Sequence, residues 1–99
     1  MIESLIQKVI YELDFIDLNI LEQLINNDYF IAFPILVKRL QKVNVWNRGI
    51  VRRRIERLRE FKLIHFEDGR SPMVIESYLH RDKEIMIMKE ALSRRLIRY

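Results

Sequence analysis

The chain has 99 residues, of which 49% are apolar and 32% charged, and its formal net charge is +4. These proportions are typical of one folded domain rather than a disordered segment, and the absence of cysteine excludes a disulfide framework and thiol catalysis. No apolar run approaches the roughly 20 residues of a membrane span, and the first residues lack the pattern of a signal peptide, so we expect a cytoplasmic protein.

The charge is distributed unevenly along the chain. Residues 1–33 carry six acidic side chains and one basic one, whereas residues 34–70 carry eleven basic and four acidic ones. Within residues 38–59 the only acid is Glu56, and most of the basic residues are arginines, whose planar guanidinium groups suit phosphate and guanine edges. This block predicts a positive surface that faces a polyanion or an acidic partner; the alternative is a solvated helix face balanced by the acidic first third.

Apolar residues at helical spacing predict two helices in the first third of the chain. The first covers residues 1–12. The second begins near Asp14 or Asp17, either of which could cap it, and ends at Asn26-Asn27-Asp28. Residues 29–32 then favour a single short edge strand.

Two further helices are expected in the basic part of the chain. The third begins near Pro34, which suits the first turn of a helix. The fourth follows the tight connection at residues 43–46 and begins at Asn47, with Asn44 as the alternative cap. The outward residues of the third helix are Lys38, Arg39 and Lys42. The fourth helix buries Val51, Ile55 and Leu58, and it exposes on its opposite face Arg48, Gly49, Arg52, Arg53 and Glu56.

The period of the apolar residues changes from helical to two after residue 62. This change predicts two strands, at residues 63–67 and 73–78. Between them, Asp68-Gly69 is compatible with a type I′ turn, which would place Arg70 at the tip of a hairpin. A last helix is expected at residues 82–98.

The order helix, short strand, helix, helix, hairpin predicts an α+β domain that is mostly α. Residues 13–21, with their Leu-Asp, Asp and Ile-Leu pattern, and residues 51–64 resemble the DNA-binding domain of leucine-responsive regulators. The pattern is shared with other winged-helix regulators, including the multiple-antibiotic-resistance and arsenic-repressor types. The resemblance implies a winged helix-turn-helix core at residues 13–79 of a single domain, with an extra helix at each terminus. We expect no ligand-sensing domain after residue 80 and no small-molecule ligand.

The resemblance also implies how such a domain would meet DNA. The helix at residues 47–59 would enter the major groove, and the hairpin tip at 68–72 would reach the minor groove or the backbone. The residue chemistry agrees, because Arg48 and Arg52 lie one turn apart near the helix start and arginine pairs bidentately with guanine. The expected major-groove residues are Asn47, Arg48, Gly49, Arg52 and Arg53. The expected backbone contacts are Lys38, Arg39, Lys42 and Arg57, and those of the hairpin tip are Gly69 and Arg70.

Several of these residues have a second interpretation. Asn47 could cap its helix rather than read adenine, and Gly49 could relax the first turn rather than let the backbone approach DNA. Arg57 and Arg59 lie toward the end of the helix, where phosphate contacts and ion pairs with nearby glutamates are both open. Arg54 lies close to the buried stripe and is expected to be structural.

Other functions find less support in the sequence. The serines and histidines suggest no catalytic triad, so we expect no enzyme and no cofactor. A zinc site would have to use His65, Glu67, His80 and Asp82, which lack the helical spacing of common ligand pairs, and we expect no metal. The main alternative is a winged-helix adaptor for protein–protein contacts, although such modules usually carry a neutral or acidic third helix.

The two terminal helices carry apolar faces that a core of residues 13–79 cannot easily cover. We expect a homodimer that buries these faces and presents two helices to an inverted repeat in double-stranded DNA; the alternative is a monomer in which the terminal helices pack on each other. The expected interface residues are Ile2, Leu5, Ile6, Val9, Ile85, Met88, Leu92 and Leu96. The sequence thus predicts a sequence-specific transcriptional regulator, with a composition like that of archaeal and archaeal-virus chains.

Overall fold

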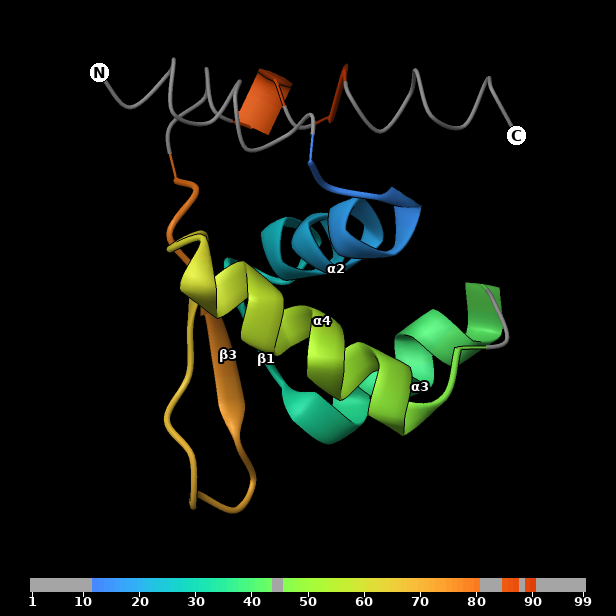
Figure 1. Ribbon diagram of the computed structural model, residues 1–99, viewed down its shortest axis with the longest axis vertical. Helices are drawn as coiled ribbons and strands as arrows, with labels where there is room; N and C mark the ends of the chain where they lie inside the picture. Colours follow the sequence, from blue (N-terminus) through green and yellow to red (C-terminus); the bar gives the residue numbers. More distant parts are fainter. Residues whose placement is uncertain (1–11, 44–45, 81–84, 88, 91–99) are drawn as a thin grey trace.

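The computed structural model describes residues 12–43, 46–80, 85–87 and 89–90 (Figure 1). Its helices are α2 (Phe15–Asn26), α3 (Phe33–Val43) and α4 (Arg48–Glu60), and its strands are β1 (Phe30–Ala32), β2 (Ile64–His65) and β3 (Val74–Ser77). The described residues near the C-terminus are also helical. The molecule is therefore a small α+β domain that is mostly helical, as the sequence predicts, and its elements follow the predicted order.

The helices begin at residues that the sequence identifies as caps. Asp14 is the N-cap of α2, and its side chain accepts a hydrogen bond of 3.1 Å from the backbone N–H of Asp17. The Asp17 carboxylate accepts one in return from the N–H of Asp14, so the two residues form a reciprocal capping box. At α4, the side chain of Asn47 accepts a hydrogen bond of 2.9 Å from the N–H of Ile50, which confirms Asn47 as the cap.

The end of α4 is closed by a Schellman motif. The N–H of Leu63 donates to the carbonyl of Leu58 at 3.1 Å, and the N–H of Lys62 donates to the carbonyl of Arg59 at 2.9 Å. This geometry requires a left-handed residue after the cap, and Lys62 takes it with a φ of 62°. A lysine therefore occupies a position that glycine usually fills.

The three strands form an antiparallel sheet in the order β1-β3-β2. Ile31 of β1 lies opposite Ile75 of β3, and Ile64 of β2 lies opposite Ser77. The central strand is thus contributed by the last part of the described core. This pairing brings the short strand before α3 against the strand that returns from the hairpin.

The hairpin differs from the one that the sequence predicts. Its strands are shorter, so that residues 66–73 form a loop, and the pairing of Ile64 with Ser77 puts the centre of the hairpin between Arg70 and Ser71. A type I′ turn needs a positive φ at both central residues, but within this loop only Gly69 has one, at 82°. The predicted type I′ turn is therefore wrong. The absent N–H of Pro72 also removes a donor for strand pairing here.

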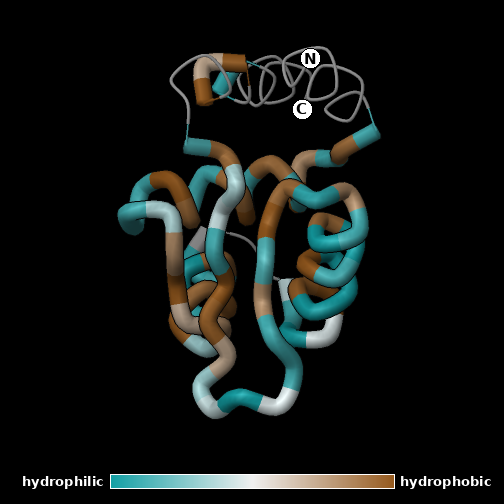
Figure 2. The backbone as a smooth tube through the Cα atoms, turned by 90° about the vertical axis from the view of Figure 1, so that its left-hand side faces the viewer, coloured by the Kyte–Doolittle hydropathy of each residue, from teal (hydrophilic) through white to brown (hydrophobic). Residues whose placement is uncertain are grey.

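The core lies between the three helices and the inner face of the sheet. The predicted inner residues of α4, Val51, Ile55 and Leu58, are all fully buried. They pack with apolar residues of α2 and α3 and with Ile31, Ile64 and Ile75 of the sheet. Figure 2 shows hydrophobic residues along the middle of the strands and hydrophilic residues at the tip of the hairpin.

The predicted terminal helices fall largely outside the described residues. Helix 1–12 lies outside apart from Glu12, which is in a turn, and the helix at 82–98 is described only as helical residues at 85–87 and 89–90. Of the predicted interface residues, Ile85 is half-buried. The others, Ile2, Leu5, Ile6, Val9, Met88, Leu92 and Leu96, are outside the described part. Within the described part, the helices are too short and too polar to cross a membrane.

Candidate nucleic-acid interface

The outward face of α4 is set by its buried face. Because Val51, Ile55 and Leu58 point into the core, Gly49 and Arg53 lie on the opposite side of the helix. The side chain of Arg53 is exposed and has no hydrogen-bond or ion-pair partner among the described residues. Helix α4 therefore presents one uncompensated guanidinium group directly to solvent.

Arg48 lies at the start of the same helix. Its guanidinium carbon is 5.1 Å from the centre of the Phe33 ring, and the residue remains exposed. This cation–π contact orients the side chain without neutralising its charge. Arg48 therefore adds a second positive charge near the N-terminal end of α4.

The third helix supplies two more free cations. Lys38 and Lys42 are exposed, and neither has a polar partner within residues 12–43 and 46–80. Arg39 differs, because its Nη1 donates to the side-chain oxygen of Asn27 at 3.0 Å and so ties α3 to the end of α2. Of the three basic residues expected at the DNA backbone from α3, two project freely and one also braces the fold.

The hairpin flank of α4 carries Arg52 and Arg59, two turns apart. Arg52 donates from Nη2 to Oδ1 of Asp68 at 2.6 Å and from Nε to Glu56 at 3.1 Å. Arg59 donates from Nη1 to the other oxygen of Asp68 at 3.2 Å. The structure thus directs Arg52, predicted to contact bases, toward the hairpin loop.

On this flank, Asp68 and the two arginines stabilise one another in their charged forms. Hydrogen bonds from Arg52 and then Arg59 hold the pKa of Asp68 below its ordinary value. The hydrogen bond to Asp68 in turn raises the pKa of Arg52. Asp68 is consequently ionised across the physiological range.

The same two arginines cover Phe66, the first residue of the hairpin loop. The guanidinium carbon of Arg59 lies 3.9 Å from the ring centre and that of Arg52 lies 5.2 Å away. Arg52 also contacts the returning arm of the hairpin, since its Nη1 lies 2.9 Å from Sδ of Met73. Both arms of the hairpin are therefore attached to α4.

The opposite flank of α4 is attached to the start of α2. Arg54 forms ion pairs with Asp14 and with Asp17, the latter at 3.6 Å, in agreement with its predicted structural role. Arg57 donates to the backbone carbonyl of Glu12 at 2.6 Å and lies 3.8 Å from the Asp17 carboxylate. Arg57, predicted to contact the DNA backbone, therefore meets partners within the chain and faces α2 instead.

Asp17 is the buried carboxylate of this flank. Desolvation raises its pKa to about 6, against the lowering effect of the Asp14 hydrogen bond and of the positive charges of Arg54 and Arg57. Its Oδ2 takes these contacts, while Oδ1 has no hydrogen-bond partner in the part of the chain that is described. The Asp17 carboxylate therefore loses its proton at a higher pH than an exposed aspartate does.

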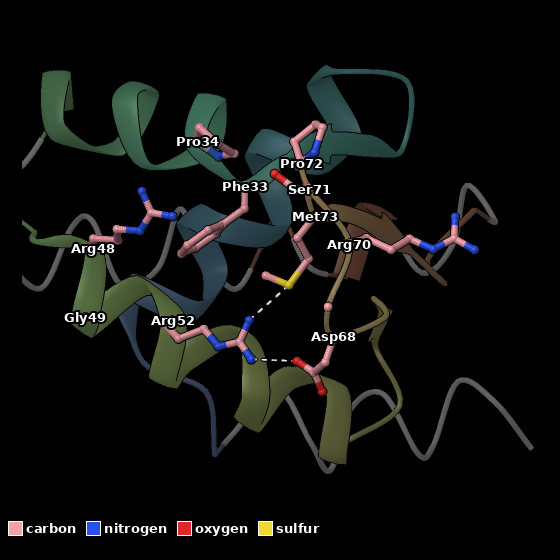
Figure 3. A pocket seen from close by; sticks show the side chains of 11 residues that line it. Phe33, Pro34, Arg48, Gly49, Arg52, Asp68, Arg70, Ser71, Pro72 and Met73 are labelled. Atoms are coloured by element: carbon pink, nitrogen blue, oxygen red, sulfur yellow. Dashed lines mark hydrogen bonds and ion pairs between the residues drawn. The ribbon is translucent and has the colours of Figure 1, made fainter.

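A groove of about 710 Å³ lies where the starts of α3 and α4 meet the hairpin loop. Arg48 and Arg70 lie on opposite sides of it (Figure 3). Arg70 is 72% exposed and forms an ion pair of 2.9 Å with Glu67. The lining is largely apolar and includes Phe33, Pro34, Pro72 and Met73. The groove therefore combines a largely apolar lining with an arginine on each side.

Gly49 has a local explanation. A Cβ atom at this position would lie 3.3 Å from Oδ1 of Asn47, the oxygen that caps α4. Any larger residue would therefore press on the cap. The expected contact of Gly49 with DNA stays a prediction, since the residue is also exposed.

Sequence reasoning missed the partners of the α4 arginines. The sequence indicates Asp68 only as a turn residue, and Phe66 and Met73 only as strand residues. One signal was present, because residues seven apart lie on one flank of a helix, so Arg52 and Arg59 could both meet a carboxylate from the following loop. The spacing of residues within α4 does not show that Asp68 of the loop lies against this flank of the helix.

The histidines lie apart from each other. His65 Nε2 is 4.0 Å from Glu67 and its ring stacks on Tyr78, whereas His80 lies against Tyr29 with ring centres 4.6 Å apart. Among the residues described, no three carboxylates or histidines gather in a way that could hold a metal ion. Asp82, the remaining residue of the zinc set weighed from the sequence, lies outside them.

Comparisons of the chain with protein-family models, with curated proteins and with solved structures found no match.

Proposed function

We propose that this chain is a winged helix-turn-helix domain that binds double-stranded DNA and acts as a transcriptional regulator without enzymatic activity. In this proposal α3 and α4 form the helix-turn-helix, and the hairpin loop at residues 66–73 is the wing. The sheet order β1-β3-β2 and the order of the helices are compatible with this fold.

The observation that carries the proposal is the uneven pairing of the basic residues. The arginines on the two flanks of α4 are held by Asp68, Asp14 and Asp17, whereas the outward positions keep their charge unpaired within the described residues. On α3 and α4, the basic residues with no ion-pair or hydrogen-bond partner among the described residues are Lys38, Lys42, Arg48 and Arg53. A positive surface of this kind, on two helices beside a groove with positive sides, suits the phosphates of a duplex.

The contacts are assigned by exposure. Arg53 and Arg48 are the candidates for base edges in the major groove, because arginine pairs bidentately with guanine. Lys38 and Lys42 would contact phosphates, which position a protein without specifying sequence. Arg70 at the tip of the wing would reach the backbone or the minor groove.

Arg53 and Arg57 provide a matched test, since both are arginines of α4 but only Arg53 projects freely. After selection of a binding site from a random duplex pool, Arg53→Ala is expected to weaken binding to that site by about 1–3 kcal/mol. Arg57→Ala is expected to leave DNA affinity nearly unchanged and to lower the melting temperature, because it removes a partner of buried Asp17. Fluorescence anisotropy and thermal unfolding give the two readouts.

Two outcomes would contradict this assignment. Equal losses of affinity for the two variants would mean that only net charge matters. The absence of any salt-dependent binding of the wild-type chain to duplex DNA would refute DNA binding itself. A supporting control is Lys42→Ala, which is expected to weaken all duplexes alike and to lower the salt slope by about 1.

The second candidate is an adaptor for protein–protein contacts, and the outer face of the sheet favours it. Phe30 and Tyr78 are each about half exposed, and Val74 is exposed on β3, where the exposed Glu76 lies opposite Phe30. Large apolar side chains at such positions occur at protein interfaces. The binding assay above separates the candidates, because an adaptor would show no selected duplex site.

A further inference from the structure

One carboxylate of the wing is bound to α4 at two points. Each oxygen of Asp68 accepts a hydrogen bond from a different arginine of α4, Oδ1 from Arg52 at 2.6 Å and Oδ2 from Arg59 at 3.2 Å. Because these arginines are seven residues apart on one flank, Asp68 spans two turns of the helix. The Asp68 side chain therefore fixes both the position of the loop along the axis of α4 and its contact with the helix.

Further contacts of the same arginines support this attachment. Arg59 also donates to the carbonyl of Phe66 at 3.3 Å, and both guanidinium groups cover the nearly fully buried Phe66 ring. Arg52 reaches Met73 on the returning arm. The loop between these arms carries Arg70, which makes its ion pair with Glu67 and none with α4 among the described residues. Of the loop residues that contact α4 in this way, Asp68 is the one closest to Arg70 in the sequence.

We propose that Asp68 is a positioning residue for DNA binding: it holds the wing against α4 through Arg52 and Arg59, so that Arg70 is presented to the duplex in a fixed place. This inference rests on the proposed function. It also changes the role of Arg52, which becomes part of the anchor rather than a reader of bases.

The proposal reverses the sign expected from simple electrostatics. Asp68 is an exposed negative charge on a surface that would face a polyanion, so its removal alone should strengthen DNA binding. If Asp68 positions the wing, its removal weakens binding, because Arg70 loses its fixed place and the ordering of the loop must be supplied on binding. The direction in which DNA affinity changes after the removal of Asp68 therefore distinguishes a positioning role from a purely electrostatic effect.

The experiment compares Asp68→Asn with Glu67→Gln. Both variants remove one negative charge from the wing, but Glu67 pairs with Arg70 and not with α4. For the duplex selected with the wild-type chain, Asp68→Asn is expected to lower affinity by about fivefold, the upper range for one exposed ion pair. Glu67→Gln is expected to keep or raise affinity. Arg70→Ala is expected to weaken the wild-type chain but to have little further effect in the Asp68→Asn background.

A readout without DNA keeps the two proposals distinguishable. Backbone NMR order parameters of Gly69 and Arg70 are expected to be near those of the helices in the wild-type chain and to fall below about 0.6 in Asp68→Asn, with α2 unchanged. If Asp68→Asn strengthens binding as Glu67→Gln does, or leaves the order of the loop unchanged, the positioning role is overturned. If the wild-type chain binds no duplex, the proposed function fails, and loop order alone decides whether Asp68 anchors the wing.

Discussion

Asp17 shows how one side chain can tie stability to pH. Its carboxylate is completely shielded from solvent at the junction of α2 and α4, and burial raises its pKa to about 6 from an ordinary value near 3.8. The folded state therefore holds the proton more tightly than the unfolded chain does. The stability that this group contributes is complete below about pH 4 and is lost as the pH rises through about 6.

Asp17→Asn is expected to remove this dependence. The amide oxygen of asparagine can still accept the hydrogen bond from the N–H of Asp14, but the side chain no longer ionises. We expect the free energy of unfolding of the wild-type chain, measured relative to the variant by urea titration, to decrease between pH 4 and pH 7. Parallel stability curves over this range would show that Asp17 stays ionised in the folded protein.

At the scale of an element, the end of α4 is closed by a residue under backbone strain. Lys62 is exposed and left-handed, and a residue with a Cβ in this conformation is typically less favourable than glycine by about 1 kcal/mol. Lys62→Gly is therefore expected to raise the melting temperature by roughly 4–8 °C, which is what 1 kcal/mol produces in a domain of this size. Lys62→Ala is the control, since it removes the same side chain but keeps the Cβ. An equal gain in both variants would assign the effect to the loss of charge.

The elements that the sequence predicts best are those whose causes are local. Asn47 caps α4 through a bond to a residue three positions away, and the inner face of that helix follows from the spacing of its apolar residues. The hairpin is predicted less well. Asp68-Gly69 favours a tight turn by itself, but in the fold Asp68 is bound to two arginines of α4, and the strands end before reaching the turn.

The candidate interface, too, is predicted where its causes are local and not where they are tertiary contacts. Its location on α3, α4 and the hairpin follows from the block of basic residues, but spacing does not say which arginines keep their charge free. Arg52 and Arg53 are neighbours in the sequence, yet one is bound by Asp68 and Glu56 and the other has no described partner. The difference arises because Asp68 comes from a loop 16 residues after Arg52, and because Glu56, one turn further along α4, lies on the flank of Arg52.

At the scale of the whole molecule, the number of copies determines the DNA site. We propose that the chain is a homodimer through its terminal helices, as their apolar spacing predicts, and that it binds an inverted repeat with half-sites roughly 34 Å apart. Sedimentation at micromolar concentration is expected to give twice the 12.2 kDa mass of one chain. Leu92→Glu is expected to halve that mass and to abolish binding to the repeat, whereas Lys89→Glu, at an exposed position, is not. A 12.2 kDa species that binds DNA tightly would contradict the dimer.

The attachment of α4 on both flanks also bears on how this sequence can change over time. Arg52 pairs with Asp68 as well as with Glu56, and Arg54 pairs with Asp14 as well as with Asp17, so the loss of one member weakens the attachment of its partner. Substitutions at 52 and 68, or at 54 and 14, are therefore tolerated best when they occur together, as co-variation between distant positions. Arg53 has no such ion-pair partner among the described residues. Under the proposed function, Arg53 is therefore a position of α4 that can change with the DNA sequence while the scaffold around it stays the same.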